Sequence, residues 1–300
     1  MINTKWTTDN IPDQKGRTIL ITGANSGIGY EAAKALAAKN GELLLAVRSL
    51  EKGELARTQI LATYPNATIQ VMALDLASLA SVKSFAEAFK QTYTKLDLLI
   101  NNAGIMIPPY KKTVDGFESQ FGTNHLGHFA LTSLLFPFLK KTAGSRIVNV
   151  SSNAHKMGNL NFEDLQWEHR RYVPWKAYGD SKIANLYFTY ELSQRIKASG
   201  SLVLASAAHP GLTNTNLAKS ALLRSFNALI AQTGNMGALP TLMAAVEPTA
   251  QSGDYFGPSG ISEWKGYPKQ VHSNKLSHDT NIAARLWSVS EKLTGFSFEI

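Results

Sequence analysis

The sequence predicts an α/β fold: one doubly wound domain with a mainly parallel sheet of about seven strands, flanked by helices. Short runs of β-branched and aliphatic residues alternate with stretches in which apolar residues recur at helical spacing. The connections are short, and a glycine-rich turn joins the first apolar run to the first helical stretch. Such alternation is typical of parallel sheets, whose two faces are both covered by helices.

Each expected element follows from its local pattern. The expected strands are the apolar runs at residues 17–22, 42–47, 68–73, 96–100, 146–150, 202–207 and 255–256. The expected helices are one closing at Asn40-Gly41, then 50–63, 78–94, 117–141, 177–197, a segment with Leu239, Leu242 and Met243, and about 279–294. We find no linker, low-complexity segment or internal repeat, so residues 1–300 are expected to form one domain with an N-terminal extension at 1–15.

The composition indicates a globular protein. Apolar residues make up 44% of the 300 residues, and no apolar run is long enough to span a bilayer. The first residues, MINTKWTTDNIPDQKGR, are polar, so we expect neither a signal peptide nor an anchor. The chain has no cysteine, which excludes disulfides, thiolate metal sites and a cysteine nucleophile. We expect a cytoplasmic protein without a metal site.

The net charge of +8 raises the possibility of a nucleic-acid partner. The basic residues are scattered in pairs such as Lys140-Lys141 and Arg170-Arg171, with no dense run. A mildly basic enzyme explains this pattern better than a nucleic-acid binder does, and a phosphorylated cofactor would use only a few of the charges.

The glycine-rich turn follows the first expected strand and opens the first expected helix. It reads Gly23-Ala24-Asn25-Ser26-Gly27-Ile28-Gly29, a GxxxGxG spacing. Glycines permit a tight turn, and the free N–H groups of a helix N-terminus bind a pyrophosphate. Many strand-to-helix turns need a glycine for structural reasons alone, but this context favours dinucleotide binding in a Rossmann-type fold.

The second and third strands end in residues that bear on the choice of cofactor. Arg48 stands at the second strand tip, where an NAD-binding site usually has an acid for the ribose 2′-hydroxyl. A guanidinium there suits the 2′-phosphate of NADP(H). Arg48 could also be an ordinary surface arginine, but the missing acid favours NADP(H) binding. Asp75-Leu76 follows the third strand, where it could contact an adenine or could equally begin a helix as its N-cap.

Further polar residues follow the later strands, at the same expected edge of the sheet. They are Asn101-Asn102-Ala103-Gly104, Ser151-Ser152 and His209-Pro210-Gly211 with Thr213 and Thr215 behind it, while Asn124 lies on the long helix between. Parallel sheets bind their ligands at this edge.

Tyr178 and Lys182 stand four residues apart at the start of a helix, and therefore on one face. A nearby positive charge favours tyrosinate and lowers the pKa of a phenol, which moves it toward use as a general acid or base. A surface Tyr and Lys on an amphipathic helix would explain the pair alone, and the rest of the chain argues against that.

Residues 216–233 carry an apolar stripe at helical spacing that includes Leu222, Phe226 and Leu229. We expect a lid over a nonpolar substrate, and a helix packed on the core has nearly equal weight.

Taken together, TGANSGIG at 22–29, NNAG at 101–104, Asn124, Ser152, Tyr178-x-x-x-Lys182 and Pro210-Gly211 strongly resemble the short-chain dehydrogenase/reductases. The likeness runs from about Lys15 to the tail, and the segments AVRS, NHLGHF and HPG resemble the retinol dehydrogenase and protochlorophyllide reductase-like branch. Membrane-bound members of that branch usually carry an N-terminal anchor, and light-dependent protochlorophyllide reductases use a cysteine. The polar first residues give no reason to expect such an anchor here, and the sequence contains no cysteine.

The resemblance implies a role for each matching residue. Tyr178 would be the acid/base, Ser152 would bind the substrate oxygen, and Lys182 would hold the nicotinamide ribose and lower the tyrosine pKa. Asn124 would anchor a water in a proton relay. The implied cofactor contacts are Gly23, Asn25, Ser26, Gly27, Ile28, Gly29, Arg48, Asp75, Leu76, Asn102, Ala103, Gly104, Tyr178, Lys182, Pro210, Gly211 and Thr213.

The implied activity is NADP(H)-dependent interconversion of a carbonyl and an alcohol on a small or apolar substrate. Two alternatives remain: a regulator that binds NADP(H) without turnover, and an enoyl reductase acting on a C=C bond. A regulator of this kind typically lacks the tyrosine or the lysine. A homo-oligomer is possible, and we expect neither a membrane span nor a nucleic-acid partner.

Overall fold

The fold is given by a computed structural model, which describes residues 5–213 and 231–300. In that part of the chain a single sheet has the order β3-β2-β1-β4-β5-β6-β7-β8. All neighbours are parallel except β7 and β8, which are antiparallel. The strands are β1 (Thr18–Thr22), β2 (Glu42–Val47), β3 (Ile69–Ala73), β4 (Leu98–Asn101), β5 (Arg146–Val150), β6 (Leu204–Ala208), β7 (Tyr255–Pro258) and β8 (Pro268–Gln270).

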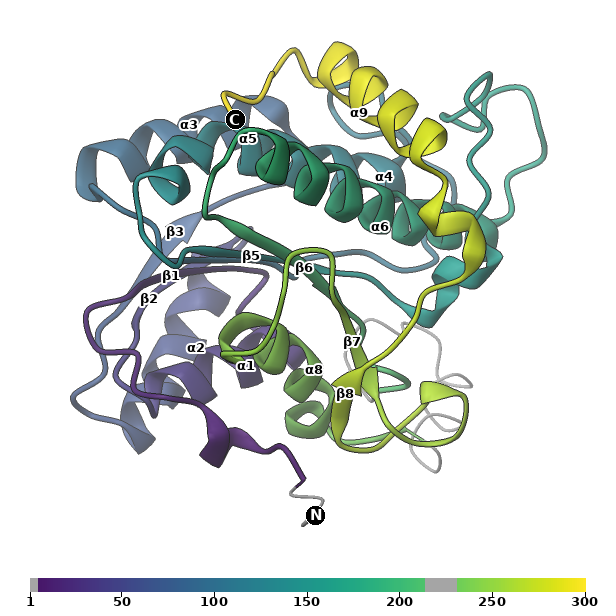
Figure 1. The fold of residues 1–300 in the computed structure, drawn as a ribbon. Helices are drawn as coiled ribbons and strands as arrows, with labels where there is room; N and C mark the ends of the chain where they lie inside the picture. The colour runs from purple at the N-terminus through teal and green to yellow at the C-terminus, as the bar shows by residue number, and fades with distance from the viewer. Residues whose placement is uncertain (1–4, 214–230) are drawn as a thin grey trace.

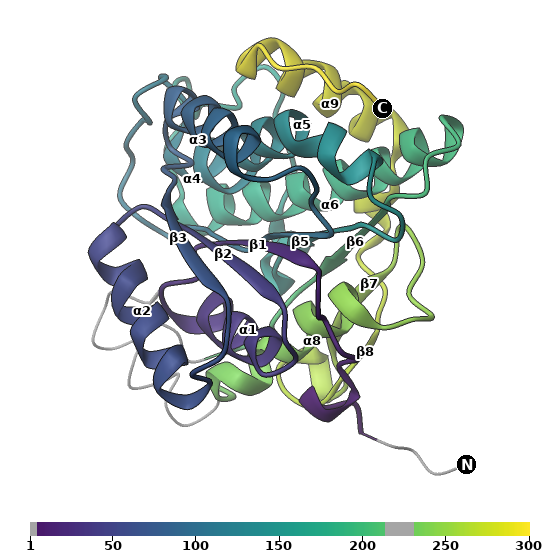
Figure 2. The same cartoon turned by 90° about the vertical axis from the view of Figure 1, so that its left-hand side faces the viewer.

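Helices cover both faces of the sheet, as Figures 1 and 2 show from two directions: α1, α2 and α8 lie on one side, and α3, α4, α5, α6 and α9 on the other. The helices are α1 (Gly27–Ala37), α2 (Leu50–Thr63), α3 (Leu79–Thr92), α4 (Ser119–Phe121), α5 (Gly127–Lys140), α6 (Pro174–Ala198), α8 (Gly234–Val246) and α9 (Thr280–Thr294). The predicted doubly wound α/β domain is confirmed.

Two apolar layers hold the helices on the sheet. On one face Ile19 and Ile21 of β1 pack with Leu36 of α1 and Leu242 of α8. On the other face Leu20 and Leu99 pack with residues of α3, α5 and α6. Successive strand residues point to opposite faces, so a strand buried on both sides is mainly apolar. All five residues of β1 are indeed buried.

The prediction of one long helix at 117–141 is wrong in detail. The segment divides into α4, a π-helical turn at Gly122–Leu126 and then α5. In the π-helical turn the Gly127 N–H donates to the Gly122 carbonyl, five residues back. Gly127 also passes so close to the end of β3 that a Cβ there would lie 2.4 Å from the Leu76 oxygen. Only glycine fits at that crossing.

Other differences are small. β8 was not expected, because its three residues include a proline and carry no alternating pattern. α6 begins at Pro174, three residues before the expected start, since proline is well suited to the first turn of a helix. Of the expected lid at 216–233, only the last three residues are described, so the lid stays a prediction.

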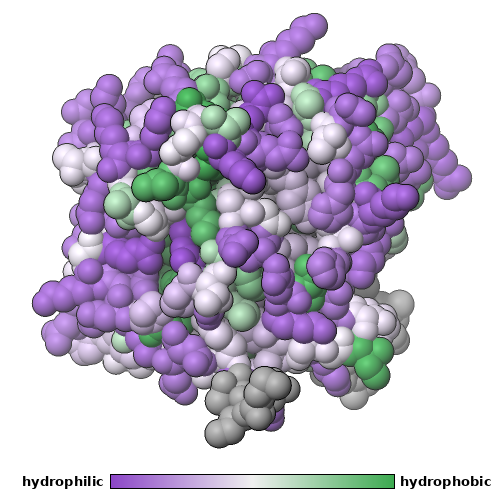
Figure 3. Space-filling view, viewed as in Figure 1, coloured by the Kyte–Doolittle hydropathy of each residue, from purple (hydrophilic) through white to green (hydrophobic). Residues whose placement is uncertain are grey.

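The face shown in Figure 1 is largely hydrophilic, with hydrophobic residues in small groups (Figure 3). Within residues 5–213 and 231–300, no helix is both long and apolar enough to cross a membrane.

Candidate active site

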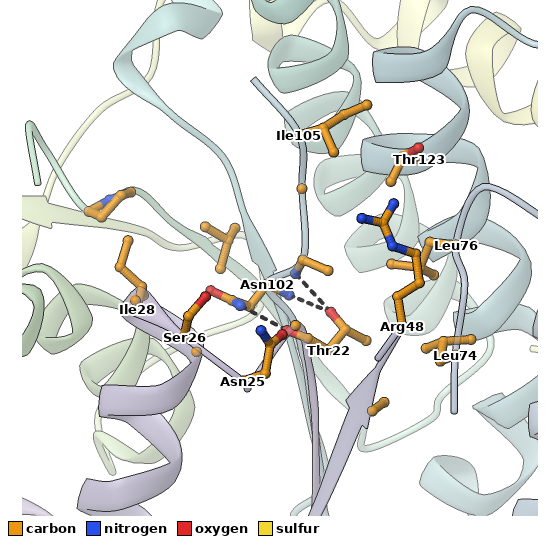
Figure 4. A pocket seen from close by; sticks show the side chains of 18 of the residues that line it. Thr22, Asn25, Ser26, Ile28, Arg48, Leu74, Leu76, Asn102, Ile105 and Thr123 are labelled. Atoms are coloured by element: carbon orange, nitrogen blue, oxygen red, sulfur yellow. Dashed lines mark hydrogen bonds between the residues drawn. The ribbon is translucent and has the colours of Figure 1, made fainter. Parts of the chain in front are cut away.

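The carboxyl ends of the parallel strands surround a cavity in which most of the residues singled out in the sequence meet (Figure 4). Every strand tip from β1 to β6, together with the start of α1, contributes to its wall. The predicted residues that line it are Gly23, Asn25, Ser26, Gly27, Ile28, Gly29, Arg48, Asp75, Leu76, Asn102, Ala103, Gly104, Tyr178, Lys182 and Pro210.

The glycine turn leaves no room for side chains on its inner side. A Cβ on Gly29 would lie 2.5 Å from Asn102 Nδ2 and 2.7 Å from the Gly23 carbonyl oxygen. Gly23 and Gly27 have φ values of 67° and 58°, which L-residues rarely adopt. Within the described part of the chain, the N-cap residue Ser26 makes no side-chain capping bond. The first N–H groups of α1 are therefore left for a ligand, and this cradle fits a pyrophosphate.

Thr22 connects the glycine turn to the NNAG segment at 101–104 by hydrogen bonds. Its hydroxyl accepts the N–H groups of Asn102 and Ala103, each at 2.9 Å, and its carbonyl accepts Asn102 Nδ2 at 2.8 Å. Asn102 and Thr22 are joined by the dashed lines in Figure 4. The two strand tips thus form one rigid wall of the cavity.

Arg48, Leu74 and Leu76 stand at one end of the cavity, away from Ile28 and Ser26 (Figure 4). Arg48 is exposed at the tip of β2. The alternative that Asp75 is a helix N-cap is wrong, because Ser78 caps α3 by accepting the Ser81 N–H. Asp75 instead accepts the Ala77 N–H at 3.0 Å, and this turn shapes the wall.

Tyr178 and Lys182 lie on the inner face of α6, and each is more than nine-tenths buried. Lys182 Nζ lies 5.7 Å from the centre of the Tyr178 ring and donates to the Val150 carbonyl at 3.1 Å. Burial lowers the pKa of Lys182 to about 8.

The prediction that Lys182 lowers the tyrosine pKa is wrong for this structure. Burial raises the pKa of Tyr178 to about 12, and a hydrogen bond with the Ser152 side chain only partly opposes that effect. The cost of taking a phenolate out of water dominates the pKa of Tyr178, and the Lys182 amine does not offset it. Tyr178 therefore holds its proton at neutral pH.

The two adjacent serines differ in what they contact. The buried Ser151 hydroxyl donates to the Lys182 carbonyl at 2.8 Å and lines the cavity, whereas Ser152 Oγ accepts the Ala154 N–H at 3.2 Å. The Ser152 side chain is near enough to Tyr178 to affect the pKa of the phenol, and its role toward a substrate oxygen stays a prediction. The carbonyl of Ser152 lies 2.7 Å from Nδ1 of His155, a buried imidazole whose Nε2 accepts the Asn274 N–H.

Asn124 lies in the π-helical turn and is fully buried. Its side-chain oxygen accepts the Ile105 N–H at 2.8 Å, and its Nδ2 donates to the Ile105 carbonyl and to Ser181 Oγ. A Cβ on Gly104 would lie 3.2 Å from Asn124 Oδ1 and 3.6 Å from Lys182 Nζ. Asn124 and Lys182 therefore face the same point of the NNAG segment.

Four predicted residues do not line the cavity itself. They include Asn124 and Ser152, whose hydrogen bonds are given above. Gly211 has a φ of 66° and a Cβ there would meet the Trp264 carbonyl at 2.4 Å, so it serves the turn after β6. Thr213 donates to the Pro210 carbonyl at 2.8 Å and closes the same turn.

Several lining residues were not predicted as site residues. They are Thr22, Ala46, Leu74, Ile105, Thr123, Val150 and Ser151. Most are strand or strand-end residues whose apolar character signals only burial. Thr22 could have been suspected, since it is a polar residue directly before the glycine turn.

Comparison with known proteins identifies the family. The family model for short chain dehydrogenases matches residues 17–224. The chain is 41% identical over 291 residues to retinol dehydrogenase 12 of Mus musculus, covering 95% of this chain and 88% of that protein. It is also 41% identical over 291 residues to retinol dehydrogenase 11 of Homo sapiens, covering 95% and 87%.

Solved structures agree. The crystal structure of an uncharacterized protein from Mycobacterium paratuberculosis matches with a TM-score of 0.85 and 43% identity, over 99% of this chain and 100% of that one. A short chain dehydrogenase from Shigella flexneri, solved with NADP, shares the fold at a TM-score of 0.64 and 23% identity, over 81% and 97%. The chain therefore belongs to the short-chain dehydrogenase/reductase family, in the branch of the retinol dehydrogenases, and is an oxidoreductase acting on alcohol or carbonyl groups.

Proposed function

We propose that the protein is an NADP(H)-dependent oxidoreductase that interconverts a carbonyl and an alcohol on a small or apolar substrate. The observation that carries the proposal is the pair of buried side chains Tyr178 and Lys182, which line the same cavity as the start of α1 and have Ser152 close to the phenol. The relatives named retinol dehydrogenases support an apolar alcohol as the substrate class.

The protein residues have distinct parts in the proposed reaction. NADP(H), when bound, supplies or accepts the hydride. In reduction, Ser152 binds the substrate oxygen and the Tyr178 phenol donates its proton to that oxygen as the C=O electron pair moves onto it. The raised pKa of Tyr178 keeps this proton in place at neutral pH, which suits reduction. Lys182 holds the cofactor ribose, and Asn124 anchors a relay water beside Lys182.

Arg48 supports NADP(H) over NAD(H). The side chain is exposed at the β2 tip and lines the cavity, and the planar guanidinium matches phosphate oxygens. The cradle at Gly29 and the start of α1 would take the pyrophosphate. The presence of all four predicted polar residues argues against a regulator without turnover. The cytoplasmic location and the homo-oligomer stay predictions.

The test is a steady-state assay of NADPH oxidation with a series of apolar aldehydes and ketones, run on the parent and on Tyr178→Phe. We expect the variant to lose about 10²–10⁴-fold in kcat, because the general acid is gone. NADPH affinity, measured by fluorescence titration, should stay near that of the parent.

Tyr187→Phe is the matched control. Tyr187 lies on the same helix and is buried, but its hydroxyl donates to the Leu276 carbonyl, away from the cavity. Its loss should leave kcat within about twofold. Turnover by Tyr178→Phe at the parent rate would refute the assigned role, and turnover of α,β-unsaturated ketones to saturated ketones would favour the enoyl reductase.

A further inference from the structure

His128 is a buried imidazole of α5 that neither lines the cavity nor belongs to the predicted site. Both of its ring nitrogens have partners, and the partners come from different parts of the site. Nε2 lies 2.9 Å from Thr22 Oγ1, beneath the glycine turn. Nδ1 lies 3.0 Å from the main-chain oxygen of Asn124.

The hydrogen bonds of Thr22 determine which nitrogen carries the proton. The hydroxyl oxygen already accepts two N–H groups, from Asn102 and Ala103, so its single proton must point elsewhere. His128 Nε2 lies at 2.9 Å, and the alternative acceptor, the Ile100 carbonyl, lies at 3.4 Å. Nε2 therefore accepts from Thr22, and Nδ1–H donates to the Asn124 oxygen.

Burial supports this neutral form. It lowers the pKa of His128 to about 4, so the ring carries one proton at neutral pH. The result is a continuous chain of hydrogen bonds. It runs from the N–H groups of the NNAG segment through Thr22 and His128 to the Asn124 carbonyl.

The Asn124 carbonyl lies in the π-helical turn, where the ladder of main-chain hydrogen bonds is shifted by one residue. The side chain of Asn124 is held separately by Ile105 and Ser181 and lies near the same point of the NNAG segment as Lys182 Nζ. The imidazole thus adds a side-chain donor with a fixed direction to the main-chain carbonyl of this residue.

We propose that His128 is a positioning residue: its Nδ1–H orients the Asn124 carbonyl for the proton relay, and its Nε2 holds Thr22 under the cofactor-binding turn. The proposal rests on the function proposed above. It predicts that loss of the Nδ1 hydrogen bond lowers kcat, whereas loss of the Nε2 hydrogen bond lowers cofactor affinity.

Three substitutions separate the two nitrogens. His128→Asn keeps an N–H donor near the position of Nδ1, and His128→Gln can place its amide oxygen, an acceptor, near the position of Nε2. His128→Phe fills the space and provides neither. Each variant is assayed for kcat with an apolar aldehyde, for NADPH affinity by fluorescence titration and for melting temperature.

We expect His128→Phe to lose at least about tenfold in kcat, because a buried carbonyl loses its donor. His128→Asn should recover kcat to within about threefold of the parent, while NADPH binds several-fold more weakly. His128→Gln should show the reverse, with NADPH affinity within about twofold and kcat as low as in the Phe variant.

His125 is the matched control, since it is also buried and lies one turn earlier. Its Nε2 pairs with Ser290 Oγ of α9 at 2.8 Å, away from the cavity. His125→Phe should alter the melting temperature and leave kcat and NADPH affinity near those of the parent.

Two results would overturn the proposal. The first is a His128→Phe variant that keeps the parent kcat. The second is a loss of kcat in all three variants that follows their melting temperatures, which would indicate a packing role only. Failure of the proposed function is a separate result: the parent itself would show no turnover, and the positioning role would fall with it.

Discussion

The cavity and the segment that precedes α6 are held by different means. The cavity, which we call the cofactor side, consists of strand tips and the start of α1, and each of the hydrogen bonds that join its blocks 22–29 and 101–104 involves a backbone group. The long segment between Ser152 and α6 contributes no residue to the cavity wall. It is held by side chains that contact residues about fifty positions away in the sequence.

Glu118 is the centre of that second arrangement. The carboxylate is fully buried and accepts the N–H groups of Gln120 and Phe121 and the hydroxyl of Tyr172, at 2.8–2.9 Å. Its own N–H donates to the side chain of Gln166. Glu118 therefore caps α4, which leads into the π-helical turn. The same residue also binds Gln166 and Tyr172 of the segment between Ser152 and α6.

Arg170 forms a second group of side-chain contacts in the same segment. The guanidinium lies 3.5 Å from the ring centre of Trp167 and pairs with Asp164 at 3.4 Å and with Asp180 of α6 at 3.7 Å. A binding site formed by backbone groups requires glycines at a few positions. A segment held by side-chain contacts requires partner residues that meet only after folding. The cofactor side should therefore tolerate changes that loosen the segment between Ser152 and α6.

The largest expected effect tests this separation. Glu118→Ala leaves two buried N–H groups and a phenol without their acceptor, which should cost about 2–4 kcal/mol of unfolding free energy. Urea denaturation measures the loss. In protein that remains folded, the Michaelis constant for substrate should rise while NADPH affinity stays close to that of the parent.

Glu168→Ala is the control for Glu118. Glu168 pairs with Lys112 in the same region, but both side chains are substantially exposed, so little stability should be lost. Equal losses in the two variants, or a parallel loss of NADPH affinity with Glu118→Ala, would contradict the independence of the cofactor side from the segment between Ser152 and α6.

Lys182 lies on α6 and lines the cavity, and its burial predicts a pH-dependent stability. The folded protein releases the lysine proton near pH 8, whereas an unperturbed lysine does so near 10.5. Below pH 8 the buried charge costs stability. As the pH rises from about 7.5 to 10, the unfolded chain binds more protons, and the parent should gain about 2 kcal/mol relative to Lys182→Met.

Unfolding free energies of the parent and Lys182→Met, measured from pH 7 to 10, provide this test. Lys197→Met is the control, because Lys197 lies exposed near the end of the same helix. It should track the parent at every pH. Parallel curves for the parent and Lys182→Met would mean that the amine is hydrated in solution.

The contrast between regions held by backbone groups and regions held by side chains also explains which parts of the structure could be predicted from the sequence. The strands and glycine turn were predictable, because burial on both faces of a parallel sheet and close backbone approach each select few residue types. Most residues of the cavity followed from that edge of the sheet and from the family resemblance. The doubly wound fold is confirmed, and the choice of Ser152 over Ser151 stays a prediction.

What was missed depends on contacts between distant residues. Glu118 has no motif around it, and its partner Tyr172 follows more than fifty residues later. The π-helical turn at Asn124 has the apolar pattern of an ordinary helix. His128 looks like any histidine on an apolar helix until Thr22 is placed beside it. The pKa of Tyr178 was mispredicted because burial cannot be weighed against a neighbouring charge without the structure.

The smallest expected effect lies on the cofactor side, where a single exposed side chain is predicted to select the cofactor. Arg48→Asp replaces a partner for a 2′-phosphate by an acid that can bind a 2′-hydroxyl. Because Arg48 is exposed at the β2 tip, water and salt screen its interaction with phosphate. We expect the ratio of NADPH to NADH affinity to fall roughly tenfold, with the larger part of the change in NADPH binding.

Fluorescence titration of both cofactors against the parent and the variant measures that ratio. Arg57→Asp is the matched control: it makes the same change of charge on α2, but Arg57 does not line the cavity and pairs with Glu54 instead. If the two variants weaken NADPH binding equally, the effect is one of net charge and Arg48 does not select the cofactor. If only Arg48→Asp changes the ratio while the kcat with saturating NADPH stays near that of the parent, the preference belongs to this strand tip. Cofactor choice would then be separable from the proton chemistry at Tyr178.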